Sequence, residues 1–113
     1  MEKRAFLSSV EESRTLNSKI FSLIRMQLLA GLADLGPDGA TYRELKAWLE
    51  AGDGVLYANL KALTGMGYVA REKVMLEGKE LELFKITDDG LEEWRRAKAW
   101  LREFSAEGGT RNG

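Results

Sequence analysis

Two residue types that carry much of protein chemistry are missing from this sequence of 113 residues. It contains no Cys, which excludes disulfides, thiolate nucleophiles and zinc–cysteine sites. It contains no His, so the commonest general base and the commonest metal ligand are absent as well. No phosphate-binding loop, dinucleotide fingerprint or metal-ligand spacing is present either. We therefore expect no enzymatic activity, no metal and no cofactor.

Long apolar runs are also missing. No run approaches the roughly 20 residues that a membrane-spanning helix needs, and the chain opens without a signal-peptide pattern. These absences predict a cytoplasmic protein with no membrane partner. The length fits one domain. The formal net charge of −1 argues mildly against nucleic-acid binding, so the distribution of charge matters more than its sum.

The best-defined pattern in the sequence covers residues 53–69. Its apolar positions recur at helical spacing and share one face: Leu56, Leu60 and Leu63. Asp53 is placed to cap the first turn, and Gly67 is placed to end the helix in a left-handed conformation. The outer face is mostly small or able to hydrogen bond: Val55, Tyr57, Ala58, Asn59, Lys61 and Ala62. This pattern predicts a recognition helix over residues 53–66.

The neighbouring segments complete a helix-turn-helix and a hairpin. Thr41 and Glu44 have capping-box spacing, and the helix that they begin should turn three apolar residues inward: Leu45, Trp48 and Leu49. A tight turn then leads into the recognition helix, which is the helix-turn-helix arrangement. After it, Tyr68–Leu76 and Lys79–Thr87 read as two strands of a hairpin.

The predicted hairpin is neutral and unusually apolar. Four cations, Arg71, Lys73, Lys79 and Lys85, are balanced by four acids, Glu72, Glu77, Glu80 and Glu82. Two interpretations stay open. The apolar residues pack against the helices, or they form an apolar surface that contacts a partner.

Helical patterns flank this unit on both sides. Residues 1–15 predict an N-terminal helix that packs on its own domain or on a partner protomer. Leu16–Leu35 predicts a long helix that is apolar nearly all round, so it lies at the domain centre or joins the domain to a partner. Residues 88–105 predict a C-terminal helix whose apolar stripe is a dimer seam or a wide core-facing surface. Its first acids, Asp88 and Asp89, suit a helix start better than a catalytic pair.

These elements predict a mainly α fold with a small β-hairpin. The expected architecture is a winged helix-turn-helix with flanking N- and C-terminal helices. It forms a single domain over residues 1–106, and residues 107–113, which are rich in Gly, predict a disordered tail.

The motif Asp-Gly-x-Leu-x-x-x-Leu-x-x-Leu-x-x-x-Gly-Tyr-Val, which begins at Asp53, resembles the recognition-helix signature of a known family. These are the small single-domain winged-helix transcriptional regulators related to the MarR and ArsR groups, of the type often found in archaea. The resemblance extends from about Leu16 to Phe104. It implies a recognition helix in the DNA major groove, a hairpin that acts as the wing, and a homodimer. The wing of this family is usually rich in Arg and Lys, and the neutral hairpin departs from that pattern.

Two functions from different classes follow. A DNA-binding transcriptional regulator would bind double-stranded DNA, with Tyr57 and Asn59 at base edges and Lys61 at guanine or phosphate. Its further contacts to phosphate would come from Thr41, Tyr42, Arg43, Arg71, Lys73 and Lys79. The alternative is a winged-helix module that binds protein, with little or no DNA binding, because one fold serves both functions. A regulator that also responds to a small molecule would add to the first reading, and the sequence names no effector.

Overall fold

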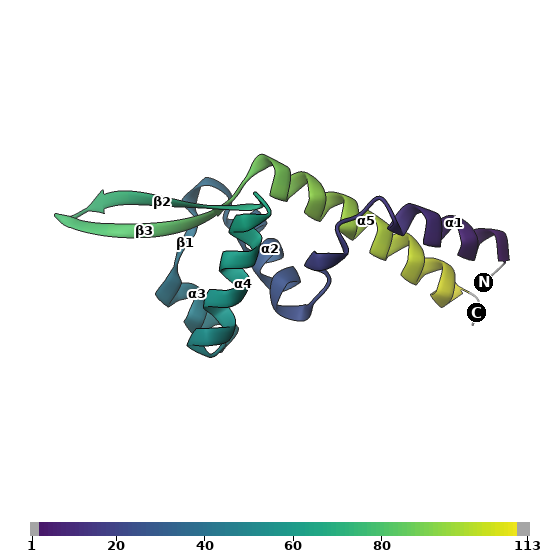
Figure 1. The fold of residues 1–113 in the computed structure, drawn as a ribbon, viewed down its shortest axis with the longest axis horizontal. Coiled ribbons are helices and arrows are strands. Elements are labelled where there is room, and N and C mark those ends of the chain that lie inside the picture. Colours follow the sequence, from purple (N-terminus) through teal and green to yellow (C-terminus); the bar gives the residue numbers. More distant parts are fainter. Residues whose placement is uncertain (1–2, 111–113) are drawn as a thin grey trace.

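The predicted architecture is present in this computed structural model, which describes residues 3–110 and, for residues 107–110, only the backbone. The molecule is elongated, with extents of 59 × 25 × 22 Å. The helix-turn-helix lies in the middle, a hairpin projects from one end, and a helical arm extends from the other (Figure 1). The helices are α1 (Lys3–Ser13), α2 (Leu23–Leu35), α3 (Tyr42–Leu49), α4 (Asp53–Gly65) and α5 (Asp88–Thr110), with short 3-10 turns η1 (Ser18–Ile20) and η2 (Gly36–Asp38). None of these described helices is long and apolar enough to cross a membrane.

The sheet has one strand more than the sequence predicted. Strands β2 (Val69–Leu76) and β3 (Lys79–Ile86) form the expected antiparallel hairpin. Glu77 and Gly78 both have positive φ, as a two-residue hairpin turn requires. The short β1 (Ala40–Thr41) pairs with the outer edge of β3, so the strand order is β1-β3-β2. A strand of two residues that leads directly into α3 is too short to show an alternating pattern in the sequence. The sequence pattern therefore did not predict β1.

The core lies between α2, α3, α4, the base of the sheet and the first half of α5. Leu56, Leu60 and Leu63 of α4 are all buried, as the helical spacing predicted. They meet apolar residues from every other layer, including Leu28, Leu32, Leu45, Val69, Phe84 and Trp94. The capping box of Thr41 and Glu44 is confirmed, and so is the positive φ of Gly67 after α4. The prediction for Trp48 is wrong, because this side chain is 57% exposed.

The long helix predicted over Leu16–Leu35 is broken near its start. Asn17 caps the 3-10 turn η1 through a hydrogen bond from the Lys19 amide, and Ser22 then caps α2. Both side chains offer the backbone an alternative to a continuous helix, and the segment uses both. Leu23, which lies within the predicted long helix, begins α2 and is 71% exposed.

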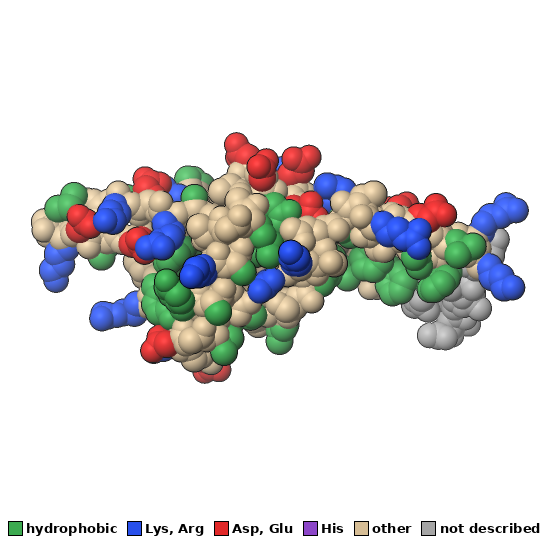
Figure 2. All heavy atoms as spheres, in the orientation of Figure 1, with side chains coloured by type: hydrophobic (Ala, Val, Ile, Leu, Met, Phe, Trp, Pro, Cys, Tyr) green, Lys and Arg blue, Asp and Glu red, His purple; other side chains and the backbone are tan. Residues whose placement is uncertain are grey.

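The arm is made by α1 and the second half of α5. Trp100 joins them, since its indole Nε1 donates to the Ser9 carbonyl at 2.8 Å, while its ring stacks on Phe104 and meets Phe21 edge-on. Phe6, Leu7 and Phe104 remain exposed, and apolar side chains run along the lower side of the arm in Figure 2. Helix α5 also ends later than predicted, because the tail expected from residue 107 is helical up to Thr110. Residues 111–113 and the first two residues of the predicted N-terminal helix lie outside the described residues.

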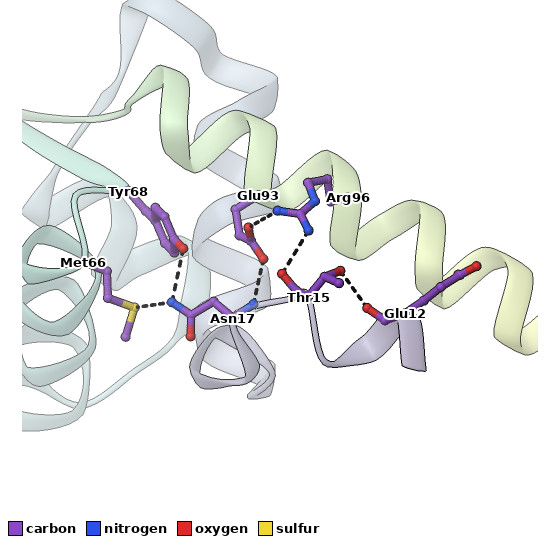
Figure 3. A network of polar contacts seen from close by, with 7 residues as sticks. All are labelled: Glu12, Thr15, Asn17, Met66, Tyr68, Glu93 and Arg96. Atoms are coloured by element: carbon purple, nitrogen blue, oxygen red, sulfur yellow. Dashed lines mark hydrogen bonds and ion pairs between the residues drawn. The ribbon is translucent and has the colours of Figure 1, made fainter. Parts of the chain in front are cut away.

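A polar network fixes the arm to the core (Figure 3). The buried carboxylate of Glu93 on α5 accepts hydrogen bonds from the backbone amide of Asn17 at 2.8 Å and from Arg96 Nη1 at 3.2 Å. Arg96 also donates to the Thr15 carbonyl. The Asn17 side chain continues the network to the Tyr68 hydroxyl at 3.1 Å. The segment before η1 is therefore held to α5 and to the start of the hairpin by directional bonds.

Candidate nucleic-acid interface

The turn between α3 and α4 is held by a small polar cluster rather than by the predicted cap. Asp53 was expected to cap α4, but Gly52 occupies that position and makes no side-chain cap. The Asp53 carboxylate instead pairs with Lys46 at 3.0 Å and accepts a hydrogen bond from the Tyr42 hydroxyl at 3.2 Å. The bond from Lys46, followed by that from Tyr42, lowers the pKa of Asp53. Removal of the Tyr42 hydroxyl from water, together with its bond to Asp53, raises the pKa of Tyr42.

The outer face of α4, which we call its front, exposes an aromatic ring and a cation. Tyr57 is 58% exposed, and Lys61 is exposed one helical turn later. No carboxylate of the described residues forms an ion pair with Lys61. The sequence predicted this exposed front, because the buried leucines occupy the opposite face.

Asn59, the third DNA contact predicted on the front of α4, forms two hydrogen bonds with other groups of the protein. Its amide nitrogen donates to the Val55 carbonyl at 2.8 Å, and its Oδ1 accepts a hydrogen bond from Nε of Arg25, also at 2.8 Å. Arg25 was not among the predicted site residues. It lies in the first turn of α2, 34 residues earlier in the chain, and no local sequence pattern connects the two side chains.

Most cations of the wing form ion pairs with glutamates of the wing itself. Arg71 pairs with Glu82 at 3.0 Å and Lys73 pairs with Glu80 at 3.7 Å, and a third ion pair joins Lys85 and Glu72 at 2.7 Å. The hydrogen bond to Glu82 is the main cause that raises the pKa of Arg71. Lys79 is the wing cation without an ion pair among the described residues. The balanced charge that the sequence indicated is thus expressed as cross-strand pairs.

A groove between α4 and the wing brings several predicted residues together. It has a volume of about 560 Å³, and Tyr42, Tyr57, Lys61 and Arg71 all line it above an apolar floor that includes Phe84. Four of the nine predicted contacts therefore share one concave surface.

The remaining predicted contacts lie outside the groove lining. Arg43 is exposed in the first turn of α3, and the Thr41 hydroxyl is engaged in the capping box. Lys73 and Lys79 lie further along the hairpin, exposed and away from the groove lining.

Charge is unevenly distributed over the molecule. Figure 2 shows Lys and Arg side chains over α4 and beside α2, whereas Asp and Glu side chains gather over the start of α5. The first turn of α5 carries Asp88 and Asp89. The acids over the start of α5 therefore lie on a different part of the surface from the cations over α4.

Solved structures with the same fold come from several organisms. A transcriptional regulator homologue protein from Pyrococcus horikoshii OT3 aligns with a TM-score of 0.71 and 20% identity, over 94% of this chain and 99% of that chain. A PadR-like transcription factor from Bacteroides fragilis aligns with a TM-score of 0.61 and 18% identity, over 77% of this chain and 90% of that chain. A protein from Streptococcus mutans UA159 aligns with a TM-score of 0.60 and 20% identity, over 81% and 91% of the two chains. At these identities the likeness shows the fold alone.

Sequence comparison gives the family. No curated protein matches this chain. Residues 24–105 match the family described as the winged helix DNA-binding domain. The match begins in α2 and ends in α5, so it includes the helix-turn-helix, the whole wing and the groove between them. This chain belongs to the winged helix DNA-binding domain family.

Proposed function

We propose that this protein is a DNA-binding transcriptional regulator that inserts α4 into the major groove of double-stranded DNA. The observation that carries the proposal is the exposed Tyr57 and Lys61 front of α4, next to a groove that also holds Arg71. Tyr57 would meet base edges, and Lys61 would meet guanine or phosphate. Arg43, Lys73 and Lys79 would add phosphate contacts at the sides. The narrower kinship with MarR and ArsR regulators stays a prediction from the α4 signature.

The binding should be modest in affinity and shallow in salt dependence. The salt slope follows the number of phosphates neutralised, at roughly 0.9 for each. Arg71 and Lys73 already have carboxylate partners, so fewer wing cations are available for phosphates.

Fluorescence anisotropy with a selected site and a scrambled duplex, at several salt concentrations, tests the proposal. Lys61→Ala should weaken binding to both duplexes and flatten the salt slope. Absence of binding to either duplex at low salt would refute DNA binding.

We also propose that the protein acts as a homodimer joined through the arm. Phe6, Leu7 and Phe104 expose apolar surface there, and such surface is usually covered by a partner. Two protomers paired in this way would direct two α4 helices at half-sites about one helical turn apart.

The oligomeric state can be tested with matched variants. Leu7→Glu combined with Phe104→Glu should give a monomer by light scattering at micromolar concentration. Leu76→Glu is the control, because Leu76 is 58% exposed at the wing tip and Leu7 is 57% exposed on the arm. Trp100 is left unchanged, since its bond to Ser9 holds the arm together. A wild-type monomer would contradict the proposed dimer.

One observation favours the second function, a module that binds protein. Met75 and Leu76 are exposed at the tip of a wing whose cations are mostly paired. If DNA binding fails, this apolar tip is the surface to test against protein partners.

A further inference from the structure

Arg25 reaches from the start of α2 to the recognition helix. Its backbone amide donates to the hydroxyl of Ser22, the residue that caps α2. Arg25 therefore lies in the first turn of α2. Its guanidinium donates from Nε to Asn59 Oδ1 at 2.8 Å and from Nη1 to the Lys19 carbonyl at 2.7 Å. These two fixed acceptors, one at Nε and one at Nη1, determine both the position and the orientation of the guanidinium.

Asn59 is arranged to hold this arginine rather than to read a base. Recognition of adenine by Asn needs the amide nitrogen as donor and Oδ1 as acceptor at the same time. Here the nitrogen is bonded to the Val55 carbonyl and Oδ1 is bonded to Arg25. The two bonds fix the orientation of the amide, and turning it toward a base would break them and release the guanidinium.

One nitrogen of the guanidinium, Nη2, is not engaged in the protein as described. Nη2 makes no hydrogen bond within the described residues, and no carboxylate there forms an ion pair with Arg25. Arg71 and Lys73 on the wing differ in this respect, because each has a glutamate partner. Arg25 is therefore a cation beside α4 that has no ion pair within the part of the chain that the structure describes. A guanidinium N–H forms a strong, charge-assisted hydrogen bond with a phosphate oxygen.

We propose that Arg25 contacts a backbone phosphate of the DNA beside the recognition helix, and that Asn59 is a positioning residue that holds Arg25 in place. This inference rests on the proposed DNA binding. It assigns a phosphate contact outside the helix-turn-helix and the wing, and it replaces the base contact that the sequence predicted for Asn59.

The test is a set of salt titrations of DNA binding, measured by fluorescence anisotropy with a selected and a scrambled duplex. Arg25→Gln should weaken binding to both duplexes and reduce the salt slope by about 0.9 per protomer. Arg25→Lys should keep most of the slope, because the charge remains. Asn59→Ala removes no charge, yet it should also weaken binding to both duplexes and flatten the slope. The control is Arg95→Gln, an exposed cation on α5, which should leave the slope unchanged.

The double variant of Arg25→Gln and Asn59→Ala distinguishes positioning from an independent contact. If Asn59 acts through Arg25, the double variant should bind like Arg25→Gln alone, because residues of one network are not additive. The inference is overturned if Asn59→Ala weakens only the selected duplex, by about tenfold or more and with an unchanged slope, as expected of a base contact. It is also overturned if Arg25→Gln, shown by circular dichroism to be folded, leaves the slope of the wild type intact.

The two proposals fail in different ways. Wild-type protein that binds neither duplex would overturn the proposed function and this inference together. Wild-type binding that responds to Lys61→Ala but not to Arg25→Gln would overturn the inference alone.

Discussion

Replacing Glu93 with Ala should loosen the arm from the core. The Glu93 residue is only 7% exposed, and its carboxylate accepts the Asn17 amide at 2.8 Å and Arg96 at 3.2 Å. A hydrogen bond to a charged group contributes about 1.5–3 kcal/mol. The pair with Arg96, whose side chain is 45% exposed, adds at most about 1 kcal/mol. We therefore expect Glu93→Ala to lower the free energy of unfolding by about 2–4 kcal/mol.

Thermal unfolding followed by circular dichroism measures this loss. For a domain of this size, about 1 kcal/mol corresponds to roughly 4 °C in Tm, so Tm should fall by roughly 8–16 °C. All variants are compared at one protein concentration, because dimer formation shifts Tm. Glu93→Gln keeps an acceptor oxygen for Asn17 and should lose less than half as much. Glu92→Ala, at an exposed position of the same helix, should stay within about 0.5 kcal/mol of wild type. A Tm for Glu93→Ala within about 2 °C of wild type would refute the reasoning.

Three further predictions concern the helix-turn-helix and its junction with α5. Leu60→Asp places an unpaired charge where the side chain is 3% exposed and should cost about 4 kcal/mol or more, so a cooperative thermal transition near that of wild type would show that α4 packs differently. Gly90→Ala should lower stability by about 1–3 kcal/mol in urea unfolding, because a Cβ there would overlap the backbone of Tyr68; a Tm equal to that of wild type would contradict this. The pKa of Asp53 is lowered by Lys46, so the folded state binds its proton more weakly than the unfolded chain does. Its contribution should be complete above an ordinary carboxyl pKa of about 4 and be lost as the pH falls through the lower folded pKa. The stability difference between wild type and Asp53→Asn should therefore shrink on acidification, and a constant difference would count against the pair.

The predictable parts of the fold were those specified locally. The period of Leu56, Leu60 and Leu63 defined α4 and its buried face, and the residue pattern of Thr41 and Glu44 defined the start of α3. The break before α2 was different, because apolar residues continue through it. There the break of the predicted helix depends on Asn17, whose backbone amide donates a hydrogen bond to Glu93 on α5. Glu93 lies 76 residues later in the chain.

The site was predictable as a surface but not as a set of contacts. Helical periodicity placed Tyr57 and Lys61 on the exposed front of α4, and the structure adds that both line the groove beside the wing. The partner of Asn59 was not predictable, since Arg25 comes from another helix. The same holds for Asp53, whose spacing suits a cap but whose carboxylate bridges Lys46 and Tyr42.

The arm also has a consequence for the order in which the chain folds during synthesis. Helix α1 is synthesised before α5, and Trp100, which bonds to Ser9, follows 91 residues later. A helix of 11 residues is marginal in water by itself, so α1 gains a stable conformation only after α5 has emerged from the ribosome. The helix-turn-helix and the hairpin emerge earlier and make many of their contacts with each other. A nascent chain can therefore form the helix-turn-helix and the hairpin before it completes the arm, with its exposed apolar side chains.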